Sequence, residues 1–170
     1  MRKLLQAVLL SGAIFPAWAA EPVTSVVIPK EIAYSNKDVI DSAIVAECAL
    51  PTRTAELLIQ ALTAADIEHK SVDKASPKSG TNVLQLEIAS ATSGGNAFMG
   101  HYKAVTVTGK LFQNGKEAGN FVVTRKSGGG AFGGFKGSCA VLGRCAETIG
   151  KDIAKWLAEP TENAKLGDAR

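Results

Sequence analysis

Three cysteines are the side chains best suited to chemistry in this chain of 170 residues, at Cys48, Cys139 and Cys145. In an oxidising compartment three thiols allow one internal disulfide and leave one thiol over. Cys139 and Cys145 are closest in sequence, but within one helix their α-carbons would lie ~9 Å apart, beyond disulfide reach. The two cysteines can pair only if Cys139 lies ahead of the helix, and Gly143, which weakens a helix, favours such a late start. We therefore predict a Cys139–Cys145 disulfide. A bridge from Cys48, or no bridge, stays open.

A glycine-rich stretch over residues 128–137 is the second chemical feature. It contains the spacing G-x-G-x-x-G from Gly128, which in nucleotide-binding proteins brings backbone amides close to phosphate. Here the pattern follows an antiparallel hairpin, and Phe135 stands where the Walker form needs lysine after glycine. The stretch is therefore interpreted as a connector, or as a docking loop that presents Phe132, Phe135 and Lys136 to a partner protein or a membrane.

Catalytic and metal-binding motifs are missing from the sequence. There is no C-x-x-C pair for a structural zinc site and no G-x-S-x-G nucleophile elbow. The sequence thus predicts no catalytic residue, no metal ligand and no cofactor. The alternative is a small hydrolase whose site is assembled from scattered residues, of which we single out Glu47, His69, His101 and Arg144.

The N-terminus predicts export. Residues 1–19 pass from a basic head, Arg2 and Lys3, through an apolar core to small residues that include Ala17 and Ala19. This order is typical of a secretory signal peptide, and cleavage after Ala19 gives a mature protein in the periplasm. The apolar core is interrupted and shorter than the ~20 residues of a membrane span, which disfavours an uncleaved anchor. Because no cysteine follows it, a lipid anchor is not expected.

The charge balance gives no support for a nucleic-acid partner. The chain has 19 basic and 16 acidic residues, and removing Arg2 and Lys3 with the signal peptide leaves 17 against 16. A nearly neutral domain without a long basic run has little attraction for nucleic acid or an anionic membrane.

The first half of the mature chain predicts strands around one helix. A β-branched run over residues 24–28 and a short apolar segment over 43–45 are candidate strands. From residue 51 to about 66 apolar side chains recur at intervals of three and four residues, which predicts a helix with a proline in its first turn. Residues 71–82 are polar and indicate a mobile connection.

The second half predicts a hairpin and a helix. Strands are expected near 84–88, 102–112 and 121–124, with a break over 90–95 and an Asn-Gly turn within 113–116. Residues 142–157 have the apolar period of a helix, and the following proline ends it. Residues 20–160 thus form one α+β domain, an antiparallel or mixed sheet of four to five strands with two helices on one face. Residues 161–170 are expected to be a polar tail.

Three segments carry a resemblance to known proteins. Residues 46–51 (AECALP), 137–145 (GSCAVLGRC) and 150–157 (GKDIAKWL) resemble a family of bacterial exported proteins with no assigned activity. The order of elements is more distantly similar to the small domain of the TolB N-terminal region, the curli secretion channel and lipoprotein activators of peptidoglycan synthases. The resemblance implies work in the envelope by contact with other proteins, without the lipid anchor of the lipoprotein members.

Together these patterns favour a non-catalytic binding or envelope-assembly module. Its expected partner is an envelope protein, contacted through the glycine-phenylalanine loop and the adjoining hairpin. A small-molecule-binding protein is a further alternative, which would need an apolar cavity between sheet and helices.

Overall fold

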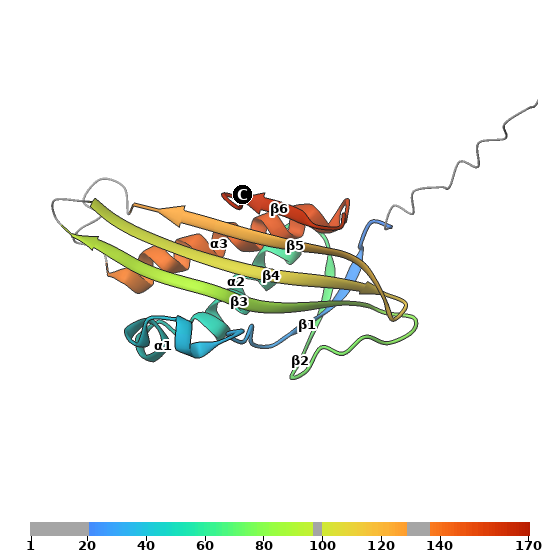
Figure 1. Ribbon diagram of the computed structural model, residues 1–170. Helices are drawn as coiled ribbons and strands as arrows, with labels where there is room; N and C mark the ends of the chain where they lie inside the picture. Colours follow the sequence, from blue (N-terminus) through green and yellow to red (C-terminus); the bar gives the residue numbers. More distant parts are fainter. Residues whose placement is uncertain (1–20, 97–99, 129–136) are drawn as a thin grey trace, which may run out of the picture.

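A mixed β-sheet forms the centre of the domain. The computed structural model describes residues 21–96, 100–128 and 137–170, with only the backbone described at 95–96 and 100–101. Within these ranges the sheet has six strands in the order β2-β1-β3-β4-β5-β6 (Figure 1). The strands are β1 (Ser25–Pro29), β2 (Glu68–Val72), β3 (Asn82–Asn96), β4 (Gly100–Gln113), β5 (Lys116–Ser127) and β6 (Ala164–Gly167). The helices are the 3-10 helix η1 (Lys37–Val39), α1 (Ser42–Glu47), α2 (Leu50–Ala64) and α3 (Ser138–Leu157).

Three long antiparallel strands, β3, β4 and β5, make up the middle of the sheet. The shorter strands β1, β2 and β6 add to it in parallel at the two sides. The β4–β5 turn has Asn114 and Gly115 at φ 53° and 81°. These are the two left-handed residues of a tight hairpin turn, so the predicted Asn-Gly hairpin is confirmed.

The helices α2 and α3 lie together on one side of the sheet (Figure 1). Alternate residues of β4, namely Val105, Val107 and Leu111, are fully buried against this layer. The helices α2 and α3 are in close contact. A Cβ atom added at Gly150 of α3 would lie only 3.0 Å from the backbone oxygen of Leu57 in α2. We call this side of the sheet the covered side and the other the open side. The core lies between sheet and helices.

The predicted α+β class is confirmed, but its element counts were too low. The missed strands β2 and β6 are short and polar, and they exist because the neighbouring strands β1 and β5 pair with them. Residues 161–170 therefore include a strand where a tail was expected. The predicted break over 90–95 is also wrong, since β3 stays paired with β4 to Asn96 and has only a bulge after Ile88.

The third helix, α1, replaces a predicted strand over residues 43–45. The Asp41 side chain accepts a hydrogen bond from the Ala43 N–H at 2.9 Å and so caps the helix. Ile44 is buried in the core. The apolar run that suggested a strand is therefore one buried turn of an amphipathic helix. Both longer helices were predicted, although α3 begins at Ser138, four residues earlier than expected.

Candidate functional site

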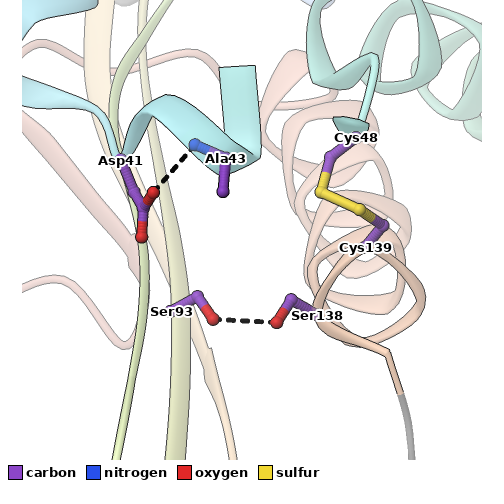
Figure 2. The surroundings of a disulfide bond; sticks show 6 residues. All are labelled: Asp41, Ala43, Cys48, Ser93, Ser138 and Cys139. Atoms are coloured by element: carbon purple, nitrogen blue, oxygen red, sulfur yellow. Dashed lines mark hydrogen bonds between the residues drawn. A yellow bond between two sulfur atoms is a disulfide. The ribbon is translucent and has the colours of Figure 1, made fainter. Parts of the chain in front are cut away.

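A disulfide joins Cys48 to Cys139, so the predicted Cys139–Cys145 pairing is wrong (Figure 2). The bond links the C-terminal end of α1 to the first turn of α3, with α-carbons 4.9 Å apart. Because α3 begins at Ser138, Cys139 and Cys145 stand six residues apart in one helix. That is the arrangement in which α-carbons are too far apart for a disulfide.

The remaining cysteine, Cys145, is a buried free thiol. Burial raises the pKa of the Cys145 thiol, because the thiolate would lose its hydration. A neutral, inaccessible thiol is a poor nucleophile. Cys145 therefore belongs to the core, where it packs with the apolar face of α3.

Arg125 of β5 connects α3 and the C-terminal segment to the sheet. Its Nε and Nη2 atoms each donate to a carboxylate oxygen of Asp152 at 2.7 Å. Its Nη1 atom lies 3.8 Å from Asp168, which also accepts from the Lys126 backbone N–H at 2.9 Å. The hydrogen bond that Arg125 donates to Asp152 raises the pKa of Arg125. Because these charges are paired with one another, the cluster has a structural role, which is to hold β5, α3 and the C-terminal segment together.

The open side of the sheet is hollowed, with a cavity volume of about 880 Å³. Residues 29–33 after β1 and 73–75 after β2 line one flank, and Asn163 before β6 lines the other. The strand side chains that face it are Gln85, Glu87, Thr108, Lys110, Asn120 and Val122. We call this feature the open-face hollow.

The chemistry of the open-face hollow suits recognition by hydrogen bonds and charge. Its lining carries both signs of charge, and Lys110 donates to Glu117 at 3.3 Å. Gln85 Nε2 donates to the Ala75 carbonyl at 3.0 Å, which holds the segment after β2 over the sheet. The described residues of its lining include no histidine, cysteine or serine.

Exposed apolar side chains also lie on the open side. Val122 and Tyr102 are 40% and 47% exposed, and in the described part only Val39 is a third exposed large hydrophobic residue. Register places both on the open side, since Val122 pairs with Thr108 and Tyr102 alternates with Val105 of the covered side. The open side therefore combines polar groups with apolar contact points.

Of the residues singled out from the sequence, Glu47, His69 and Arg144 do not line the hollow. The predicted docking residues Phe132, Phe135 and Lys136 lie outside the described residues, as does the side chain of His101. His69 of β2 lines a different pocket of about 290 Å³, beside β1 and the β4–β5 turn. Neither Glu47 nor Arg144 lines that pocket, so these described residues do not gather there.

Two further properties of the described residues bear on function. They contain no cluster of three or more His, Cys, Asp or Glu side chains with the geometry to hold a metal ion. Among them, every helix is too short or too polar to cross a lipid bilayer.

The open-face hollow was not predicted from the sequence, although the hydrated strand face in it was. The alternation of Thr106, Thr108 and Lys110 with apolar residues predicted a hydrated strand face. The flanks come from residues 29–33 and 73–75, which are distant in sequence from β4. No local sequence pattern indicates that these flanking residues and β4 border the same surface.

Comparison with known proteins gives a fold but no family. No family model matches the sequence, and no functionally curated protein matches it. Protein XCC0632 from Xanthomonas campestris, of family DUF330, is 10% identical, with 85% of this chain and 88% of that chain covered and a TM-score of 0.55. At this identity the likeness shows a shared fold alone.

Two weaker likenesses are to proteins of other bacteria. A minor lipoprotein from Acinetobacter baumannii is 9% identical over 79% of this chain and 92% of that chain, with a TM-score of 0.47. The PelC dodecamer from Paraburkholderia phytofirmans is 12% identical over 78% and 90%, also with a TM-score of 0.47. The similarity to TolB and the curli channel stays a prediction.

Proposed function

We propose that this chain is an exported, non-catalytic binding protein of the bacterial envelope, and that its open-face hollow contacts a polypeptide of another envelope protein. One observation carries the proposal. The sheet is covered by helices on one side, while its open side presents a hollow of about 880 Å³. A surface of this kind is available for a partner without any rearrangement of the core.

The lining favours a polypeptide over an apolar small molecule. Small-molecule sites are mostly apolar and enclosed, with few polar groups. Here Gln85, Glu87, Lys110 and Asn120 supply donors, acceptors and both charges, and Val122 adds an exposed apolar contact. Mixed polar surface around apolar contact points is typical of interfaces between proteins.

The Cys48–Cys139 disulfide supports export, because disulfides persist in oxidising compartments such as the periplasm. The signal peptide over residues 1–19 and the docking role of Phe132, Phe135 and Lys136 stay predictions. Mass spectrometry of the protein isolated from a periplasmic extract tests the first of these. We expect a mature N-terminus at Ala20 and a mass lower by two hydrogen atoms than that of the fully reduced chain.

Site-specific photocrosslinking in the producing cell tests the binding surface. A photoreactive residue at position 108, in the hollow, is expected to give a discrete adduct with one envelope protein. The control places the same residue at 56, which is exposed on α2. The substitution Val122→Arg, added to the position-108 probe, is expected to remove the adduct by placing a long cation in the contact.

Two results would contradict the proposed function. One is an identical adduct pattern from positions 108 and 56. The other is an adduct at 108 that survives Val122→Arg in a protein with an unchanged circular dichroism spectrum.

A further inference from the structure

Three neighbouring rows of side chains cross the open side of the sheet, where β3, β4 and β5 run side by side (Figure 1). Each row takes one residue from each strand, and residues opposite each other in a row are near enough to interact. The rows are Gln85, Lys110 and Asn120, then Glu87, Thr108 and Val122, then Ser90, Thr106 and Thr124. The first two rows line the open-face hollow. The rows differ in how far the protein itself uses their polar groups.

The first row is bonded within the protein. Gln85 and Lys110 donate to the partners given above. The Asn120 side chain donates to the Glu117 carboxylate at 3.0 Å and accepts from the Asn163 backbone N–H at 2.9 Å. All three side chains of this row are therefore held in place by the fold.

The second row has no such bonds. Among the described residues, Glu87 takes part in no ion pair, and neither its carboxylate nor the Thr108 hydroxyl makes a hydrogen bond. Glu87 is exposed, and Val122 at the other end of the row is 40% exposed. In the third row, by contrast, the hydroxyl oxygens of Thr106 and Thr124 lie 3.0 Å apart. We call Glu87, Thr108 and Val122 the free row.

The charge of the open-face hollow favours a cation. The described residues of its lining include two lysines, Lys74 and Lys110, against four acids. Three of these acids have partners within the protein, namely Glu31 with Thr52, Asp73 with Lys30 and Glu117 with Lys110. The fourth acid is Glu87 of the free row, and no ion pair joins Lys74 to it. The negative charge that the described residues leave unpaired in the hollow therefore lies at Glu87.

The two ends of the free row are separated by a distance that suits a peptide. The chain leaves β3 after a single β1–β3 pair and meets it again at Tyr34, opposite Ile88. Between these points residues 29–33 line the flank of the hollow. Glu87 thus lies beside this flank, and Val122 lies two strand spacings away, about 10 Å. About three residues of an extended peptide span that distance.

We propose that the free row determines the specificity of the open-face hollow, and that it selects a polypeptide segment in which a lysine or arginine lies within about three residues of an apolar side chain. The cation pairs with the Glu87 carboxylate, and the apolar side chain covers Val122. A charge-assisted contact of this kind is strong once the partner shields it from water. An acidic or wholly apolar segment would leave the Glu87 carboxylate covered and unpaired, which is costly. This inference rests on the proposed function and adds the chemistry of the partner.

Photocrosslinking from position 108 in the producing cell, repeated with variants of Glu87, tests the inference. Glu87→Gln keeps the shape of the side chain and removes its charge, so the yield of the adduct should fall by about tenfold or more. Glu87→Lys should abolish the adduct, because it places two cations together. The matched control is Glu68→Gln, which removes an exposed acid of β2 that lines a different pocket. Its adduct yield should equal that of the wild type.

A charge reversal separates a direct contact from a general disturbance of the surface. Mass spectrometry of the wild-type adduct identifies the crosslinked segment of the partner, in which we expect a lysine or arginine near an apolar residue. Replacing that basic residue by glutamate in the partner should weaken the adduct with the wild type and restore it with Glu87→Lys. A disturbance of the surface by Glu87→Lys would not be reversed by this exchange.

The failure of this inference is distinguishable from the failure of the proposed function. An adduct at position 108 that Val122→Arg removes, but that Glu87→Gln and Glu87→Lys leave unchanged, would overturn the inference and leave the proposed function standing. A crosslinked segment without lysine or arginine would do the same. An identical adduct pattern from positions 108 and 56 would contradict the proposed function, and this inference with it.

Discussion

Two cations enter the layer between sheet and helices as diagonal neighbours, and only one of them is paired. Arg125 of β5 stands opposite Val105, two residues from Lys103 of β4. Arg125 meets Asp152 at 2.7 Å and Asp168 at 3.8 Å, whereas Lys103 meets no acid of the chain. The stem of Lys103 is buried, but its ammonium is not among the buried side-chain atoms of the described residues that lack a partner.

The difference distinguishes a cation that acids of the fold hold in place from one whose side chain only packs. At Arg125 the fold supplies both charges, and the ion pairs connect β5, α3 and the end of the chain. At Lys103 the fold buries the aliphatic stem and supplies no acid for the ammonium. The two ends of α3 differ accordingly, since a disulfide holds the Lys103 end and an ion pair holds the Arg125 end.

The largest expected effect on stability comes from removing the Cys48–Cys139 disulfide. The double substitution Cys48→Ala with Cys139→Ala opens a loop of 91 residues and should lower the free energy of unfolding by about 4 kcal/mol. Urea unfolding, followed by circular dichroism, measures it. Reduced wild type is the control and should match the variant, while a wild-type midpoint unaffected by reductant would show that the bond contributes nothing.

A smaller effect is expected at the paired cation. Arg125→Met leaves Asp152, which is 18% exposed, without its bidentate partner, and should cost about 2 kcal/mol of stability. Faster hydrogen exchange over β6 should accompany it, because Asp168 loses the same contact. The control is Lys110→Met, which breaks an exposed pair and should cost less than about 0.5 kcal/mol. Equal losses from the two variants would show that the Arg125 cluster is no more than a surface ion pair.

Local patterns were enough to predict the long elements of this fold. Three- and four-residue spacing of apolar side chains predicted α2 and α3, and Asn114 with Gly115 predicted the hairpin. The edge strands β2 and β6 have no such pattern, because their existence depends on pairing with β1 and β5. Tertiary pairing decided these short polar segments.

The disulfide was mispredicted because Gly143 was interpreted from its low helix propensity alone, without the side chains that pack against it. Gly143 suggested a helix that starts late, which would free Cys139 to reach Cys145. In the structure a Cβ at Gly143 would stand 2.7 Å from the Arg53 guanidinium of α2, so the glycine makes room for a packed side chain inside the helix. The helix therefore runs on from Ser138, and Cys139 faces Cys48.

The unpaired lysine had a signal that sequence reasoning overlooked. Lys103 is in phase with Val105, Val107 and Leu111, the apolar side of the predicted strand. A lysine in that phase either pairs with an acid or buries only its stem and extends its ammonium to water. Which of the two holds depends on the neighbours that the fold supplies, and the sequence alone does not reveal that Asp152 lies at Arg125.

The most direct measurement compares the two cations by urea unfolding of Lys103→Met, Arg125→Met and the wild type in chloride buffer without phosphate or sulfate. We expect Lys103→Met to be within about 0.5 kcal/mol of the wild type, since methionine keeps the buried aliphatic stem and removes a charge that no acid of the chain pairs. Arg125→Met should lose about 2 kcal/mol in the same buffer. If Lys103→Met instead lost as much as Arg125→Met, Lys103 would have a countercharge within the protein, and the contrast between the two cations would not hold.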